Sequence, residues 1–352
     1  MQPTSYGVRR LPVMAAPAGD APAQAGALAR VAPLPRVGII RNPRSHRNKG
    51  IDAQEPADCP VSIAAPRRKA DIGDALAQFA QDGIGLLVID GGDGTIRDVL
   101  SRGAPIFKDA WPQVAVLPKG KTNALGVDLG VPRLWTLNEA LEAAKRGSTV
   151  ARRPLVVKRL DAEQPVRLGF FLGAGVFNAA IAAGQVAHRA GAFQSFAVGV
   201  TAAFGVGQSL LGFGKSPWRS ISPMRIQPVG IPGGFPRSAH TAPEGRFLFA
   251  LSTLTKFPVG IRPFPWNAGD RSADRGAINY FVIDAPLRRA MAMLPVALYG
   301  RDTGSLDKLG IHRGAAHEFG LELGESFILD GETYPAGDYR VSAGPELHFI
   351  VP

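Results

Sequence analysis

The chain has 352 residues, a formal net charge of +11 and a single cysteine, and 45% of its residues are hydrophobic. One cysteine excludes an intramolecular disulfide framework and a cysteine-rich metal site, and it fits a reducing compartment. The length suits about two domains, and the hydrophobic content is ample for packed cores. The positive charge favours an anionic partner, namely nucleic acid, an anionic membrane surface or a phosphorylated substrate, over a basic surface kept for solubility alone.

Residues 1–35 are rich in alanine, proline and glycine and follow neither the helical nor the strand period, which predicts a disordered arm. Arg9 and Arg10 precede a short apolar patch, as they would in an export signal. Two prolines interrupt that patch and an aspartate follows it, so we expect the chain to stay in the cytoplasm.

Strands and helices alternate over residues 36–147. Strands are predicted over 36–42, 61–65, 86–89 and 114–117, and helices over 71–81, from Thr95 onward, and over 134–146. Alternation of this kind predicts a parallel, doubly wound sheet. Ligands bind at the carboxyl edge of such a sheet, where the basic, polar loop that begins Asn42-Pro43 is expected.

The stretch LLVIDGGDGTIRDV, residues 86–99, joins an apolar strand to a glycine turn and then to a helix. Its glycines allow the backbone to approach a ligand closely, and the helix that starts at Thr95 presents free N–H groups to an anion such as phosphate. Asp93 would repel a phosphate directly. We therefore expect Asp93 to hold Mg2+, to orient a nucleotide hydroxyl or to accept a proton.

After residue 147 the composition changes to short strand candidates separated by turn residues, which predicts a mostly β second half. Helices are expected near 186–212 and 286–300. Residues 190–214 contain no charged side chain, but their glycines and polar residues disfavour a membrane span, so we expect a buried or lipid-facing helix of a soluble domain. The predicted fold is α/β plus β, with a Rossmann-like parallel-sheet domain at 36–147 and a mostly antiparallel β-sandwich domain at 148–352.

Three motifs in order resemble the catalytic domains of the diacylglycerol and sphingosine kinases: the Asn-Pro loop, GGDGT, and DGE near the carboxyl end. The turn LPKGKTNALGVDLGVP resembles the second loop of these lipid kinases, and the resemblance covers residues 36–352. It implies an ATP-dependent kinase that transfers the γ-phosphate to a primary hydroxyl of a membrane lipid, with diacylglycerol as the first expectation. The first domain would then bind the nucleotide and the second the lipid.

The resemblance also implies roles for particular residues. Glu332 matches the proton acceptor for the lipid hydroxyl, Asp93 is the second catalytic residue, and Asp274 matches a structural Mg2+ ligand. Without the resemblance, Glu332 would suit a solvated turn and Asp274 a surface carboxylate paired with a neighbouring arginine. The implied ATP-binding residues are Asn42, Gly91, Gly92, Asp93, Gly94, Thr95, Gly120, Lys121, Thr122 and Asn123.

The chain departs from the family pattern at several positions. Lys121 and Thr122 replace a Thr-Gly pair, and Ala124 replaces an aspartate. A lysine can pair with nucleotide phosphates as a point charge, so this change is compatible with binding. Arg275 and Asn279 stand where a glycine and a second aspartate are expected, which leaves Mg2+ binding by the Asp274 segment open.

A kinase that acts on lipids must meet a membrane, and basic residues on both sides of the uncharged segment favour attachment to the anionic inner face of the membrane. Nucleic acid is not expected as a partner, because no aromatic and basic motif accompanies the charge. The alternatives are a ceramide or sphingoid-base kinase, an NAD kinase, and a non-catalytic nucleotide- or lipid-binding relative. An NAD kinase is disfavoured because the Asn-Glu segment expected soon after its glycine turn is absent. The sequence indicates neither the lipid nor the oligomeric state.

Overall fold

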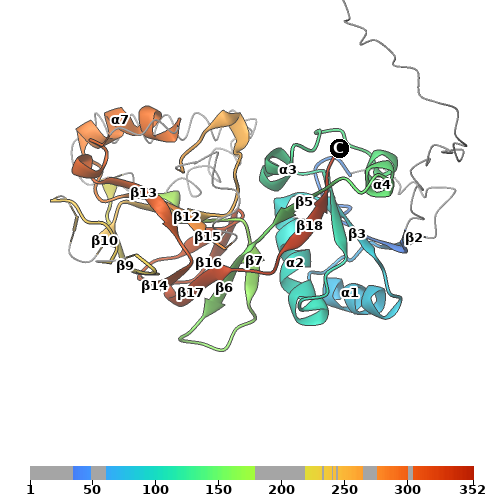
Figure 1. Ribbon diagram of the computed structural model, residues 1–352. Helices are drawn as coiled ribbons and strands as arrows, with labels where there is room; N and C mark the ends of the chain where they lie inside the picture. The colour runs from blue at the N-terminus through green and yellow to red at the C-terminus, as the bar shows by residue number, and fades with distance from the viewer. Residues whose placement is uncertain are drawn as a thin grey trace, which may run out of the picture. The chain divides into compact units, whose positions relative to one another are not determined.

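In the computed structural model, the described residues form three six-stranded sheets (Figure 1). The structure describes residues 35–48, 61–178, 219–231, 234–239, 241–242, 245–264, 276–299 and 304–352. The predicted N-terminal arm up to residue 34, the helix predicted near 186–212 and Asp274 lie outside the described residues.

The first sheet has the strand order β2-β1-β3-β4-β18-β5 and confirms the predicted doubly wound, mostly parallel arrangement. The strands that run parallel are β1 (Val37–Arg41), β2 (Val61–Ala64), β3 (Leu86–Gly91) and β4 (Gln113–Pro118). Next to them, β18 (Leu347–Ile350) pairs parallel with β4 and antiparallel with β5 (Thr149–Arg152). The predicted strands over 36–42, 61–65, 86–89 and 114–117 are therefore all present.

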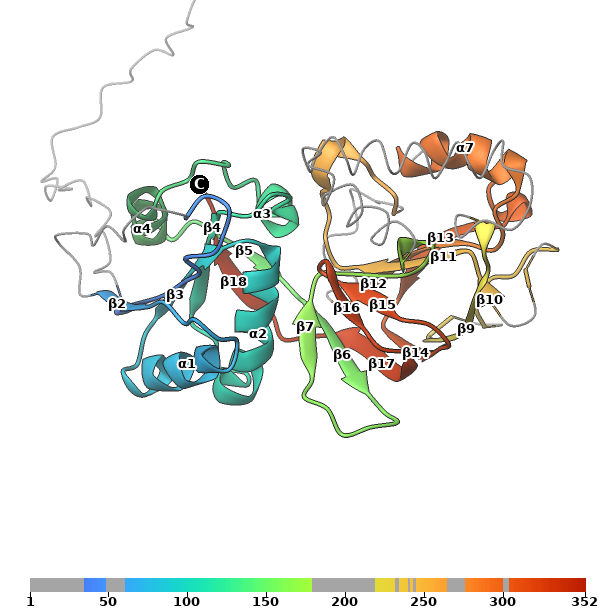
Figure 2. The same ribbon diagram turned by 180° about the vertical axis from the view of Figure 1, so that it is seen from behind.

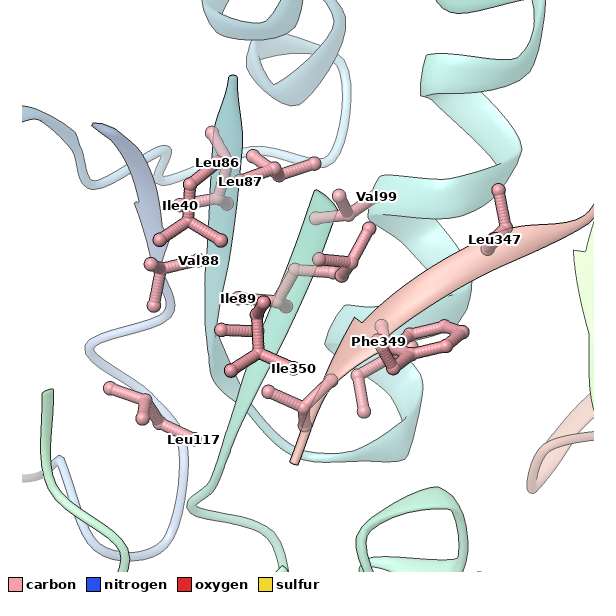
Figure 3. Close-up of a cluster of buried hydrophobic side chains, with 14 of the residues drawn as sticks. Ile40, Leu86, Leu87, Val88, Ile89, Val99, Leu117, Leu347, Phe349 and Ile350 are labelled. Carbon is pink, nitrogen blue, oxygen red and sulfur yellow. The ribbon is translucent and has the colours of Figure 1, made fainter. Parts of the chain in front are cut away.

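The strand β18 reaches the first sheet from the far end of the chain. Leu347, Phe349 and Ile350 are fully buried and pack in one cluster with the strand residues of β3 and with Val99 (Figure 3). The first sheet thus draws strands from both sides of residue 147. The domain boundary predicted at that residue stays a prediction.

The helices that accompany the first sheet are α1 (Asp71–Gln81), α2 (Asp93–Phe107), α3 (Ala124–Leu129) and α4 (Leu137–Lys145). α1 has the predicted bounds, and the helical period places its apolar residues inward, so that it packs beside α2 (Figures 1 and 2). The start predicted for α2 at Thr95 is wrong by two residues. β3 also continues through Asp90 and Gly91, because β1 and β4 pair with it on both sides to those positions.

The predicted β-rich second half consists of two antiparallel sheets with a shared hydrophobic core. One sheet, in the order β10-β9-β14-β17-β6-β7, contains β6 (Leu155–Arg159), β7 (Arg167–Gly169), β9 (Ser222–Val229), β10 (Gly245–Arg246), β14 (Glu318–Leu323) and β17 (Gly337–Ala343). The other, in the order β13-β12-β11-β8-β15-β16, contains β8 (Phe171–Gly175), β11 (Leu248–Ser252), β12 (Ile278–Ile283), β13 (Ile311–Ala316), β15 (Phe327–Leu329) and β16 (Glu332–Tyr334). Phe249 and Phe319, one from each sheet, meet edge to face with ring centroids 6.2 Å apart.

The second predicted late helix is α7 (Arg288–Leu298), which lies within the span expected near 286–300. In the part of the chain that the structure describes, none of the helices combines the length and the apolar character needed to cross a membrane. α2 packs against β7, so the helix that follows the GGDGT turn contacts the sheets of the second half (Figure 2).

Candidate active site

The glycine turns after β3 and β4 touch each other through their backbones. A Cβ atom on Gly92 would lie 2.8 Å from the Cα of Gly120, and a Cβ on Gly120 would lie 2.7 Å from the Cα of Gly92. Lys119 donates its backbone N–H to the carbonyl of Gly91 at 2.9 Å and joins the turns further. Because only a hydrogen atom fits between them, the two turns form one continuous edge at the N-terminus of α2.

The Asn42 loop is tied to the same edge. Asn42 donates its backbone N–H to the carbonyl of Asp90 at 2.9 Å and its side-chain Nδ2 to Thr95 Oγ1 at 2.8 Å. Asn42 Oδ1 accepts the backbone N–H of Arg44 at 3.0 Å. Asn42 therefore holds Thr95 and the first loop together, and its binding of nucleotide stays a prediction.

Asn123 closes the second turn with both ends of its amide. Its Oδ1 accepts the N–H of Gly120 at 2.8 Å, and its Nδ2 donates to the carbonyl of Gly120 at 2.9 Å. The residue takes the left-handed conformation (φ 51°), which asparagine tolerates better than most residues, and it is the N-cap residue before α3. Lys121 and Thr122 are exposed at the tip of the turn, where a phosphate can reach them.

Asp93 lies between the two glycine turns and the start of α3. Burial raises the pKa of its carboxyl, and the backbone N–H groups of Ala124 and Leu125 offset part of that rise. Asp93 Oδ1 is buried and has no hydrogen-bond partner among the described residues. A buried carboxylate oxygen without a partner fits a cation or a bound hydroxyl better than a solvated turn.

Asp330 brings the DGE turn (residues 330–332) to this place from the far end of the chain. Its carboxylate accepts the backbone N–H of Phe170 at 3.0 Å and that of Phe171 at 2.9 Å, which anchors the turn between β7 and β8. Burial and the nearby charge of Asp93 raise the pKa of Asp330 to about 7. The two aspartates predicted from separate motifs therefore lie close enough for each charge to oppose the other.

This raised pKa predicts a pH-dependent stability. A carboxyl whose folded pKa lies above its unfolded pKa contributes stability that is complete at low pH and is lost as the pH rises from about 4 to about 7. The unfolding free energy of wild type minus that of Asp330→Asn should thus fall by about 3 kcal/mol between pH 5 and pH 8, as measured by urea unfolding. Asp109→Asn, at an exposed turn, is the matched control. A difference that stays constant across this range would contradict the assignment.

Glu332 is held by two cations that the sequence analysis did not single out. Lys69 Nζ lies 2.7 and 2.9 Å from its two carboxylate oxygens, and Arg97 Nη2 donates to Oε2. Burial alone would raise the pKa of Glu332, but Lys69 and Arg97 lower it below its usual range, so this carboxylate is ionised at neutral pH. In the sequence, the one feature that could have pointed to Arg97 is its position four residues after Asp93, which places both side chains on the same face of α2.

Asp93 could hold a divalent cation together with the phosphates of a nucleotide. Among the described residues, no group of three or more histidine, cysteine, aspartate or glutamate side chains could hold a metal ion by itself. Mg2+ in nucleotide sites commonly takes one or two carboxylates and completes its shell with phosphates and water. Asp93, with its unpartnered Oδ1, offers one such carboxylate. Mg2+ binding by Asp274 stays a prediction outside the described residues.

Known proteins resemble the chain in sequence and in fold. Residues 36–154 match the family model of the diacylglycerol kinase catalytic domain. The diacylglycerol kinase of Bacillus subtilis (strain 168) is 29% identical over 137 residues, which are 37% of this chain and 43% of that relative. The chain therefore spans less than half the length of this curated relative.

Solved structures extend the likeness of fold to both halves of the chain. A crystal structure of a diacylglycerol kinase from Bacillus anthracis strain Sterne has a TM-score of 0.59 at 16% identity and covers 91% of this chain and 98% of its own. A second crystal structure from that strain reaches 0.63 at 17% identity with the same coverage. The predicted Rossmann-like domain followed by antiparallel sheets is confirmed, and over residues 36–154 the chain is similar in sequence to the diacylglycerol kinase catalytic domain family.

Proposed function

We propose that the protein is an ATP-dependent lipid kinase that transfers the γ-phosphate of ATP to a primary hydroxyl of a membrane lipid, with diacylglycerol as its substrate. The observation that carries this proposal is the meeting of three distant segments at one end of α2. The two glycine turns contact each other there, and Arg97 of the same helix binds Glu332 from the far end of the chain. The match of residues 36–154 to the model of the diacylglycerol kinase catalytic domain supports the same reaction.

The glycine turns would bind the phosphates of ATP. Their backbones approach to the limit that glycine allows, and the N-terminus of α2 adds the free N–H groups and positive end of a helix dipole. Lys121, exposed on the second turn, would pair with a phosphate as a point charge. Mg2+ held by Asp93 and the phosphates would neutralise charge during transfer.

Glu332 would act on the acceptor. Its carboxylate is ionised and 40% exposed, so a lipid hydroxyl can reach it from solvent or from a membrane surface. As the hydroxyl oxygen bonds to the γ-phosphorus, the bond from that phosphorus to the β–γ bridging oxygen breaks, and the hydroxyl proton passes to Glu332. The products are a phosphorylated lipid and ADP.

Attachment to the membrane would be peripheral and electrostatic. Arg288 and Arg289 are both exposed at the start of α7, and Arg225 is exposed on β9. Together with the net charge of +11, they support binding to the anionic inner face of a membrane.

The proposal is tested by following labelled phosphate from ATP onto a panel of acceptors. The panel contains diacylglycerol, monoacylglycerol, ceramide and sphingosine in mixed anionic vesicles, and NAD in solution. We expect a labelled product from diacylglycerol that disappears when Mg2+ is chelated. Label on NAD would instead indicate an NAD kinase, label on ceramide or sphingosine would reassign the lipid, and ATP binding without any product would indicate a non-catalytic relative.

A further inference from the structure

Arg97 forms hydrogen bonds on both sides of the DGE turn. Its Nη1 donates to the carbonyl of Leu329 at 3.3 Å, just before the turn, and its Nη2 donates to Glu332 Oε2, just after the central glycine. The same guanidinium donates to Asp98 Oδ1 from Nε at 3.2 Å and from Nη2 at 2.8 Å. Only arginine carries enough donors, in a rigid planar fork, to make these bonds at once.

The side chain of Arg97 is 4% exposed, which makes it a fixed part of the interior. A buried guanidinium loses much of its hydration, so it must be compensated by hydrogen bonds and opposite charge. Here that compensation comes from Asp98 on its own helix and from Glu332, 235 positions further along the chain. Arg97 therefore couples the GGDGT helix to the proposed acceptor residue.

The DGE turn has an unusual backbone conformation. Asp330 and Gly331 both have positive φ angles, 46° and 80°, which is a sparsely populated conformation for aspartate. Glu332 begins β16, which among the described residues is the last strand of its sheet and pairs with β15. Strand pairing fixes the backbone of Glu332 but not its side-chain rotamer, and the carboxylate is bound by Lys69 and Arg97.

Lys69 contributes differently. It lies 3.5 Å from Asp98 Oδ2 as well as within hydrogen-bond distance of Glu332, so two cations and two carboxylates form one network. The Lys69 side chain is 55% exposed and can leave Glu332 when an acceptor arrives, whereas the buried Arg97 cannot. Arg97 is therefore the permanent partner of Glu332, and Lys69 is a partner that an acceptor can replace.

We propose that Arg97 is a positioning residue for Glu332 and that its bonds to Leu329 and Glu332 hold the DGE turn against α2, with the carboxylate fixed beside the proposed phosphate site. This inference rests on the proposed function. It adds a residue outside GGDGT and DGE whose effect on transfer passes through Glu332.

Arg97→Gln tests the inference by kinetics. We expect kcat for the lipid to fall about tenfold to a hundredfold, because a displaced catalytic group costs rate even when binding is intact. The KM for ATP should stay within about twofold, and the acid limb of the pH–rate profile should move to higher pH, since Glu332 loses a cationic partner. The double variant Arg97→Gln/Glu332→Gln should be no slower than Glu332→Gln alone. The inference would be overturned if the losses of kcat in the two single variants multiplied in the double variant. It would also be overturned if Arg97→Gln had the kcat and the acid limb of wild type.

Arg68→Gln is the matched control. Arg68 precedes Lys69, is 81% exposed and pairs with Asp71 at 2.7 Å on the surface, so its removal should leave both kcat and the acid limb unchanged. Arg97→Lys is the second variant, in case Arg97→Gln fails to fold. It keeps a positive charge beside Glu332 but cannot also reach the Leu329 carbonyl, so kcat should fall while the acid limb stays in place.

The inference about Arg97 can also be tested if the protein proves not to be a lipid kinase. If wild type phosphorylates no lipid in the panel, the kinase proposal falls, and the coupling is tested without turnover by NMR titration of labelled glutamate carboxyl carbons. The Glu332 signal is identified by its loss in Glu332→Gln. Its pKa should be higher in Arg97→Gln than in wild type, and an unchanged value would overturn the inference.

Discussion

Replacing Glu332 by glutamine is expected to lower lipid phosphorylation by about a hundredfold or more, the order attributed to a general base. The amide keeps the size and shape of the side chain but cannot accept the hydroxyl proton. Arg97 retains Asp98 as a charged partner after the change, so the fold should persist. The measurements are steady-state rates with diacylglycerol vesicles and ATP affinity by calorimetry, which should change by no more than about twofold.

Glu322→Gln is the control for this loss. Glu322 lies on β14, in the second half of the chain, and makes an exposed ion pair with Arg225 at 3.7 Å. Exposed pairs of this kind contribute about 0–1 kcal/mol, so neither rate nor stability should change measurably. Full turnover by Glu332→Gln would remove the residue from the role of proton acceptor.

The second large effect is expected for Gly92→Ala. Its new methyl group would lie 2.8 Å from the Cα of Gly120, on backbone that cannot rotate away, so the two glycine turns must separate. Because the φ angle of Gly92 is −99°, the cost is steric rather than conformational. We expect a loss of about 1–3 kcal/mol of unfolding free energy, as for other overpacked sites, with a loss of ATP binding of more than about tenfold.

Gly73→Ala separates this steric effect from any general effect of losing a glycine. Gly73 lies within α1, and a Cβ there would meet nothing within 4 Å. Alanine should therefore stabilise the helix by about 0.5–1 kcal/mol and leave ATP binding unchanged. Urea unfolding and calorimetry measure both variants; equal ATP affinity in Gly92→Ala and wild type would refute a nucleotide site at the meeting of the turns.

Local sequence patterns were sufficient to predict β3, which leads into GGDGT, and the preceding helix α1. The apolar run at 86–89 and the helical spacing of Ile72, Leu76 and Phe79 express short-range preferences, and β3 and α1 follow them. The end of β3 and the start of α2 were misplaced by two residues each, because pairing with β1 and β4 extends the strand beyond what local preference supports.

Two of the predicted nucleotide-binding residues, Asn42 and Asn123, stabilise the loops that contain them. Asn42 and Asn123 were expected to contact nucleotide, and their amides are engaged in organising the two loops. The Asn42 bond joins residues 53 positions apart, and neither it nor the local turn closed by Asn123 follows from helical or strand periodicity. Nucleotide contact by these residues stays a prediction.

The GGDGT stretch could be recognised from local pattern because it is glycine-rich and follows an apolar strand, whereas the DGE turn was singled out only by its resemblance to the lipid kinases. What lies between them was decided by tertiary structure alone. Arg97 is a polar residue on an amphipathic helix by local rules, and it becomes buried only because β7 and the DGE turn pack on that face of α2. β18 likewise completes the first sheet from the last residues of the chain. Sequence thus determined which chemical groups are available and which turns present them, whereas contacts between segments more than two hundred positions apart decided which carboxylate is ionised and what holds it.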